Sequence, residues 1–373
     1  MKMKHMARAV WSVIFILGLV SSPSASGGVP VVFLNPGAPG DVFFQPMTDF
    51  MQAAAEDLGF ELDVYYGNRN HVLIDENVEK LFSRKKLPRY VLGMNARGGG
   101  ESFLARAEAA GVETVFINQG FLEEDQKNVG RPGEKYTRWL FEYLPNDTQA
   151  GYVLAKKLIQ VAVQDGLVDG DGMVNVIAVS GHEASPASIL REKGLQEAVA
   201  EFSNTRLRQV VHADWKQDRA KELSKRLMQR YPDTAVVWSA SDAMAEGVLE
   251  SLNELGKRPG TDVLIGGVDW TVRALELVKE GEFTVSVGGH FMDGGWALVM
   301  LYDAMHGVEV PRSSLSRFFS LTRTNIYSYH SAFDASDWRK IDFTKFSKYL
   351  NPTLEKYNFG LEAVLDQVEV LHP

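Results

Sequence analysis

Short runs of β-branched and aromatic residues alternate along the chain with longer segments whose apolar positions recur at helical spacing. Residues 29–34 predict a buried strand, and residues 43–58, ended by Gly59, predict an amphipathic helix. Further strands are predicted at 62–66, 90–94, 114–117, 174–179, 208–212, 235–238, 263–268 and 283–287. Helices are predicted through 78–84 and at 101–110, 188–201, 218–231, 242–255 and 272–280.

This alternation predicts right-handed βαβ units and parallel sheets that carry helices on both faces. Because it occurs in two stretches, we expect an α/β protein with two doubly wound parallel-sheet lobes. The boundary falls near Pro145, since proline disfavours helix at the residue before it. Asn146 or Asp147 can cap the helix that opens the second stretch.

The last part of the chain, residues 312–373, lacks the alternation but is rich in aromatic residues. Disordered tails are poor in such side chains, so we expect a packed extension. The aromatic residues are Phe318, Phe319, Tyr327, Tyr329, Trp338, Phe343, Phe346 and Tyr349.

Residues 1–26 have the organisation of a secretory signal. Basic residues precede an apolar run at 9–20, which suits a signal peptide and is short for a bilayer span. Small residues then precede a cleavage site after Ser26. We therefore expect an exported, periplasmic protein, with an uncleaved membrane anchor as the alternative.

Composition narrows the function classes. A chain of 373 residues, 45% hydrophobic, suits two domains with their own cores. The formal net charge of −9 disfavours nucleic-acid binding, because an acidic chain is not attracted to phosphate backbones. The absence of cysteine excludes disulfides, thiolate nucleophiles and cysteine-ligated metals.

Candidate binding residues lie in the loops that follow the predicted strands, where ligands of open parallel sheets bind. The loops offer amides, carboxylates, one arginine and aromatic rings, a set that suits a neutral polyhydroxyl ligand. Its hydroxyls both donate and accept hydrogen bonds, and its ring stacks on aromatic faces. The candidates are Asn35, Phe43, Phe44, Asn118, Gln119, Arg191, Trp215, Ser241, Asp269 and His290.

Several of these residues also have a structural interpretation. Phe43 and Phe44 could belong to the core, and Trp215 could be a surface aromatic. Asp269 could cap the following helix, and Arg191 could pair with a neighbouring glutamate on the surface. For Asp242 we favour an N-cap role, and we keep Ser241 as the ligand contact.

Catalytic and cofactor motifs are weak. The segment beginning His182-Glu183 is not a His-Glu-x-x-His zinc motif, and the histidines lack metal-ligand spacing. The glycine run after Arg97 lacks both the phosphate-loop and the dinucleotide patterns. Acidic residues 123–125 are interpreted as a solvated polar loop. We expect no metal, no cofactor and no enzyme activity.

From Asn35 to about Pro311, the order of these loops resembles the type I periplasmic binding proteins, in particular the ribose- and galactose-binding branch. Residues 235–287, which include SASDAMAEGVLESLNELG and a Gly-x-Asp run, carry the strongest likeness. The helix ASILREKGLQEAVAEF at 187–202 resembles the ligand-arginine helix of the family, and residues 41–59 contain the double phenylalanine. A branch of periplasmic autoinducer receptors, which signal through a sensor kinase, is similar too.

The resemblance implies two lobes joined by three crossovers, closing on a ligand as a hinged clamp. It implies a first lobe of residues 27–145 plus about 290–318, and a second of 146–289 plus part of 319–373. The resemblance places Phe44 and Trp215 where aromatic rings stack on the ligand. It places Arg191 and Asp269 where side chains form hydrogen bonds with the hydroxyl groups of the ligand. Four positions depart from the pattern: Asn118 and Gln119 replace an Asp-Arg pair, Ser241 replaces asparagine, and Gly289 beside His290 replaces a polar residue.

Three functions follow as hypotheses. The first is a monomeric solute-binding protein that captures a sugar-like ligand and delivers it to an ABC-type membrane permease. The second is a receptor of the same fold that signals to a membrane sensor kinase, with the aromatic extension as its partner surface. The third is a two-lobed hydrolase, which we disfavour because no nucleophile and base pair can be named.

Overall fold

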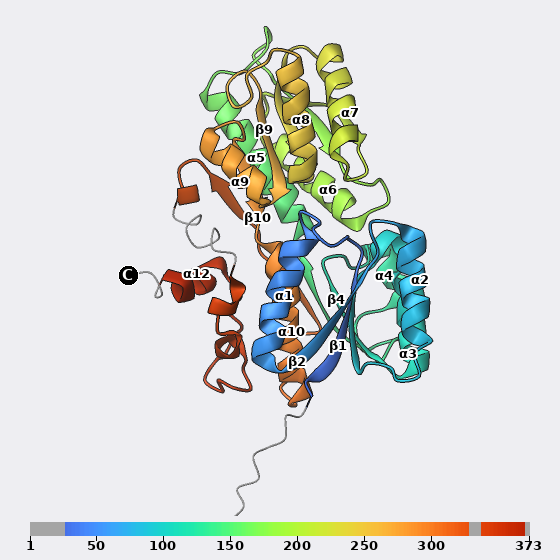
Figure 1. The fold of residues 1–373 in the computed structure, drawn as a ribbon. Helices are drawn as coiled ribbons and strands as arrows, with labels where there is room; N and C mark the ends of the chain where they lie inside the picture. Colours follow the sequence, from blue (N-terminus) through green and yellow to red (C-terminus); the bar gives the residue numbers. More distant parts are fainter. Residues whose placement is uncertain (1–26, 328–336, 370–373) are drawn as a thin grey trace, which may run out of the picture.

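The computed structural model describes residues 27–327 and 337–369, so the predicted signal segment 1–26 lies outside the described residues. Two six-stranded sheets form the centres of two lobes (Figure 1). The first sheet has the order β11-β5-β4-β3-β1-β2 and is parallel throughout. Its strands are β1 (Val29–Asn35), β2 (Phe60–Tyr66), β3 (Tyr90–Gly93), β4 (Glu113–Ile117), β5 (Trp139–Pro145) and β11 (Ser313–Ser316).

The second sheet has the order β12-β10-β9-β8-β6-β7 and is parallel except for the antiparallel edge strand β12. Its central strands are buried on both faces, as continuous apolar runs in covered parallel sheets require. The strands are β6 (Val174–Ser180), β7 (Thr205–His212), β8 (Thr234–Ser239), β9 (Leu264–Asp269), β10 (Val285–Gly288) and β12 (Phe319–Thr322).

Helices cover both faces of each sheet (Figure 1). In the first lobe these are α1 (Phe44–Leu58), α2 (His71–Phe82), α3 (Gly100–Ala110), α4 (Glu123–Val129) and α10 (Asp293–Met305), with α10 packed on α1. In the second they are α5 (Asp147–Gln164), α6 (Pro186–Glu201), α7 (Gln217–Arg230), α8 (Asp242–Glu254) and α9 (Val272–Glu280). The predicted fold class is confirmed.

The chain passes between the lobes at three places. It crosses from β5 to α5 at Asn146, from β10 to α10 through the short turn η2 (His290–Met292), and from β11 to β12 at residues 317–318. The side chain of Asn146 accepts a hydrogen bond from the N–H of Gln149, so Asn146 is the cap that begins α5. Asp147 has another role, described below.

Some elements differ from the sequence predictions. The acidic residues 123–125, expected in a loop, form the first turn of α4, where carboxylates interact favourably with the helix dipole. The helix through 78–84 ends at Phe82. Helix α10 was not predicted because it is buried nearly all round and so lacks an amphipathic signature. Strands β5, β11 and β12 were also missed.

The C-terminal extension packs on the first lobe, beside α1 and α10 (Figure 1). It contains η3 (Trp338–Lys340), η4 (Phe343–Phe346) and α12 (Leu361–Glu369). Phe50 of α1 meets the ring of Phe343 edge-on at 5.0 Å between centroids, and Trp296 of α10 stacks on Phe359 at 4.9 Å. The expectation of a packed extension holds for its described residues, because Trp338, Phe343 and Phe346 are buried.

A single buried carboxylate also holds the extension to the lobe. Asp303 of α10 accepts hydrogen bonds from the N–H groups of Lys348 and Tyr349, at 2.8 and 3.1 Å. The hydroxyl groups of Ser347 and Tyr357 donate to the same carboxylate. Four donors of the extension therefore depend on one side chain.

We predict that Asp303→Ala lowers the free energy of unfolding by about 2–4 kcal/mol, because buried donors lose their acceptor together. Urea unfolding measures the change, and limited proteolysis of residues 337–369 measures release of the extension. Asp49→Ala, which removes an exposed carboxylate of α1, is the matched control. Equal stability of the two variants would contradict the prediction.

Candidate functional site

A cavity of about 160 Å³ lies between the two lobes. Both sheets contribute the loops at the carboxyl ends of their strands, which is where a doubly wound sheet binds ligands. Nine of the ten residues predicted from the sequence line it: Phe43, Phe44, Asn118 and Gln119 from the first lobe, Arg191, Trp215, Ser241 and Asp269 from the second, and His290 from a crossover. Their contact with a ligand stays a prediction.

The tenth residue, Asn35, does not line the cavity. Its side chain is buried at the end of β1, where Oδ1 accepts a hydrogen bond from the N–H of Gly37 and Nδ2 donates to Thr48. Both ends of the amide are thus used to shape the turn before α1, and the assignment of Asn35 to the ligand site was wrong.

Arg191 is the most constrained side chain of the site. Its Nε atom lies 2.7 Å from Oδ1 of Asp147, and one terminal nitrogen donates to the carbonyl of Ala240 at 2.7 Å. The same nitrogen lies 3.7 Å from the Asp269 carboxylate. Only 4% of the Arg191 side chain is exposed, so the alternative of a surface ion pair is wrong.

Close contact between α5 and α6 allows this ion pair. A Cβ atom on Gly151 would lie 1.9 Å from the carbonyl oxygen of Arg191, and one on Gly194 would lie 2.0 Å from that of Thr148. Only glycine permits such an approach of two backbones. The two glycines therefore bring the start of α5, with Asp147, within reach of Arg191.

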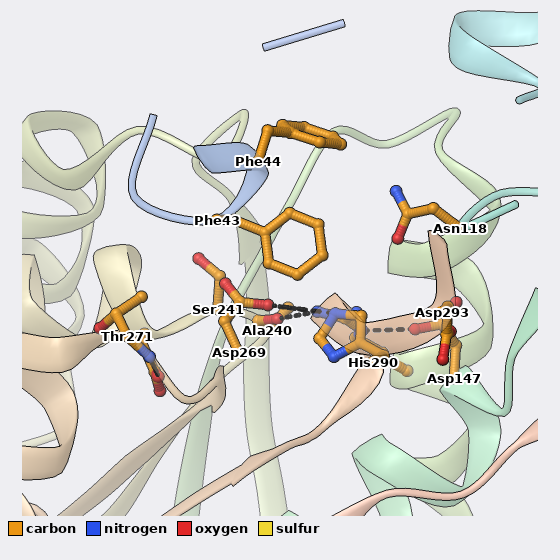
Figure 2. Close-up of polar contacts among 12 residues, drawn as sticks. Phe43, Phe44, Asn118, Asp147, Ala240, Ser241, Asp269, Thr271, His290 and Asp293 are labelled. Atoms are coloured by element: carbon orange, nitrogen blue, oxygen red, sulfur yellow. Dashed lines mark hydrogen bonds and ion pairs between the residues drawn. The ribbon is translucent and has the colours of Figure 1, made fainter. Parts of the chain in front are cut away.

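Aromatic rings border the cavity on both lobes. Figure 2 shows Phe43, Phe44, Asn118, Asp269 and His290 around the same space. The rings of Phe43 and His290 are stacked, with centroids 4.7 Å apart. On the second lobe the Arg191 guanidinium lies 5.8 Å from the centroid of Trp215. The aromatic residues are therefore part of the site, and Phe43 and Phe44 are buried as well.

Strained backbone is concentrated at this site. Among the described residues other than glycine, eight have a positive φ, and six of those eight line the cavity: Arg69, Arg97, Asn118, Asp214, Trp215 and Asp269. Such conformations are costly for side chains with a Cβ and cluster where function requires them. The clustering supports the cavity as a candidate functional site independently of its residue types.

Two polar side-chain atoms of residues that line the cavity are buried and have no hydrogen-bond partner among the described residues. They are the hydroxyl oxygen of Ser185 and Nδ1 of His290, whose residues are 5% and 1% exposed. Burial lowers the pKa of His290 below its ordinary value, so the ring is neutral at pH 7. Buried polar groups are normally satisfied, so these two atoms are suited to a polar ligand.

The cap of α8 is Ser241 and not Asp242, as the sequence had favoured. Ser241 is the N-cap of α8 and accepts from the N–H of Met244, although it also lines the cavity. Asp242 is fully buried and accepts from Ser286 and from the N–H of Thr271. Burial and then the nearby Asp269 charge raise the pKa of Asp242 well above its ordinary value. Thr271, not Asp269, caps α9.

The sequence predictions missed Arg69, which follows β2. Its guanidinium binds the carboxylate of Asp41 through two hydrogen bonds, of 2.6 and 2.9 Å. Burial alone would raise the pKa of Asp41, but Arg69 and two backbone N–H groups lower it below its ordinary value. Ligands bind at the carboxyl ends of parallel strands, and Arg69 lies in the loop after the second predicted strand. Applying this rule to that strand would have identified Arg69 as a candidate. Arg97, His182, Ser185, Asp214 and Lys216 also line the cavity.

No group of three or more histidine or carboxylate side chains among the described residues is arranged to hold a metal ion. Within the described chain, no helix has the length and apolar character needed to cross a membrane.

The chain belongs to the periplasmic binding protein domain family, whose model matches residues 31–307. The ribose import binding protein of Salmonella typhimurium is 23% identical over 77% of this chain and 87% of its own length. The D-allose-binding periplasmic protein of Escherichia coli K12 is 28% identical, but this match spans only 38% of the chain and 46% of that relative.

Solved structures show the same architecture. A periplasmic sugar-binding protein from Pseudomonas fluorescens superposes with a TM-score of 0.81 and 32% identity, over 90% of this chain and 99% of that one. An ABC transporter solute-binding protein from Actinobacillus succinogenes 130z, solved with bound D-allose, gives a TM-score of 0.70 at 18% identity, over 80% of this chain and 99% of that one. The predicted family resemblance is confirmed.

Asp293 is the first residue of α10 and directly follows the second crossover. It is fully buried and accepts a hydrogen bond of 2.8 Å from Ser316, and burial raises its pKa well above the ordinary value. The folded protein therefore holds a proton that the unfolded chain releases above pH 3.8. This carboxyl thus lowers the free energy of unfolding as the pH rises from 3.8 toward the higher pKa of the folded state.

We predict that the unfolding free energy of Asp293→Asn increases relative to wild type between pH 4.5 and 7.5, measured with urea. A constant or decreasing difference would contradict this.

Proposed function

We propose that the protein binds a small sugar-like ligand in the cavity between its lobes and delivers it to an ABC-type permease in the membrane. The observation that carries this proposal is the convergence of Phe44, Trp215, Arg191 and Asp269, from two separate lobes, on one cavity. The names of the relatives above, which bind ribose, allose or sugars in general, support the ligand class. They are binding proteins, which supports a function without catalysis.

The size of the cavity favours a monosaccharide. At about 30 Å³ per water molecule, 160 Å³ corresponds to roughly five waters. A single sugar ring with its hydroxyls replaces such a cluster, so the cavity matches a monosaccharide. The unpartnered Nδ1 of His290 would pair with a hydroxyl.

Ligand recognition would combine two kinds of contact. The rings of Phe43, Phe44 and Trp215 offer apolar faces to the C–H faces of a sugar. Arg191, held in place by Asp147, donates from a fixed direction, and Asp269 and the Asn118 amide accept or donate beside it. A rigid arrangement of this kind rejects analogues that lack a hydroxyl, because its polar groups would stay unpaired.

Binding would stabilise the conformation in which both lobes contact the ligand, as differential affinity for one conformation shifts the equilibrium. The three crossovers are the natural hinge. We infer that the closed form is what the permease recognises, and that the protein acts in the periplasm after removal of residues 1–26.

The competing receptor function depended on an open aromatic surface of the extension. Trp338, Phe343 and Phe346 are instead buried against the first lobe, although Tyr327 and Tyr349 stay exposed, so most of the predicted aromatic surface is not available to a partner. The transport function is therefore preferred. Recovery of permease subunits from membranes by the tagged, ligand-loaded protein would support it, and recovery of a sensor kinase would favour the receptor.

Calorimetry with D-ribose, D-allose, D-galactose, L-arabinose and myo-inositol tests the ligand class. We predict that at least one binds, and that Trp215→Ala weakens its binding by about 10–100-fold through loss of a stacking face. Tyr327→Ala, which removes an exposed ring outside the cavity, is the control and should change nothing. Equal effects of the two substitutions, or no binding to any sugar or polyol, would contradict the proposal.

A further inference from the structure

We propose that the cavity contains an anion subsite at the N-terminus of α6, so that the preferred ligand is a sugar bearing a carboxylate or phosphate group rather than a neutral sugar. This inference rests on the proposed function, and it changes the ligand class that the sequence alone suggested.

The charged side chains that line the cavity are not balanced. Arg69 is neutralised by Asp41, and Arg191 by Asp147 and Asp269. The remaining carboxylate of the lining, Asp214, is bound by Arg219. Every carboxylate of the lining thus already has a cation.

Two cations of the lining, Arg97 and Lys216, form no ion pair within the part of the chain that the structure describes. Arg97 comes from the first lobe, in η1 (Ala96–Gly98), and Lys216 from the second, immediately before α7. Arg97 has a φ of 50°, a conformation rare for residues with a Cβ. An excess of positive charge therefore borders the cavity from both lobes, although the whole chain has a net charge of −9.

The start of α6 supplies neutral donors to the same space. Ser185, which lines the cavity, is its N-cap residue but makes no capping hydrogen bond, and its buried hydroxyl has no partner among the described residues. Pro186 opens the helix, so the N–H groups of Ala187 and Ser188 are the first donors of its first turn, where intrahelical acceptors are absent. Helix N-termini bind anions through such N–H groups and through the helix dipole.

These observations fit one ligand geometry. The sugar ring would lie against the aromatic residues and Arg191, and its anionic group would point to the N-terminus of α6. The Ser185 hydroxyl would donate there, with Lys216 and Arg97 supplying charge from either side. An anionic group would give these two exposed cations a counterion, which a neutral sugar does not.

Calorimetry tests this with matched pairs: D-glucuronate and D-glucose 6-phosphate against D-glucose, D-galacturonate against D-galactose, and ribose 5-phosphate against D-ribose. We expect at least one anionic sugar to bind tenfold or more tightly than its neutral parent, with an affinity that falls as salt rises. The carboxylate and phosphate arms identify the anionic group.

Three variants assign the effect to residues. Arg97→Gln, Lys216→Gln and Ser185→Ala should each weaken binding of the anionic sugar by about tenfold, as expected for loss of one charge-assisted contact, and leave the neutral parent unchanged. Lys127→Gln, an exposed lysine of α4 outside the cavity, is the control. Neutral sugars that bind as tightly as their acids, or variants without a selective effect, would overturn the anion subsite while leaving the proposed function intact. Failure of every sugar, charged or neutral, would overturn both.

Discussion

The buried ion pair of Arg191 and Asp147 is the interaction on which the rest of the site depends. The two side chains are 4% and 5% exposed, and removing either partner would leave an uncompensated charge in the interior. Asp147 stands at the first crossover, and the second crossover supplies His290, 3.4 Å from the guanidinium. The third supplies Phe318, whose ring lies 5.9 Å from it. The group that would bind the ligand therefore contacts all three connections between the lobes.

This arrangement suggests how ligand binding and hinge geometry are coupled. A ligand hydroxyl or anion that hydrogen-bonds to Arg191 would change the electrostatic interactions of the guanidinium with its neighbours. These neighbours are Asp147, Asp269 and His290. Because buried packing is stiff, small displacements there would be transmitted to the crossovers instead of being absorbed locally. Phe43, stacked on His290, extends the same contact into the first lobe. Residues 337–369 of the extension pack instead against α1 and α10.

The sequence was most informative where one physical rule acts on every strand. Strand ends of parallel sheets meet at one edge, so loops after different strands could be placed together without knowing their contacts. Asn35 failed because a side chain at a strand end can equally shape its own turn. Asp242 was predicted as the cap in place of Ser241 because the cap is the residue with extended φ and ψ, here −147° and 158° at Ser241, which spacing does not reveal. Helix α10 was missed because burial on all sides removes the polar face that periodicity requires.

The central claim is that both lobes contact the same bound ligand, through Arg191, Asp269 and the aromatic residues. The most direct measurement is a crystal structure of the protein with the monosaccharide, neutral or acidic, that binds most tightly in solution. The account predicts sugar density between Phe44 and Trp215, within hydrogen-bond distance of Arg191 and Asp269. Density at any other surface, with the space between the lobes left to solvent, would contradict it.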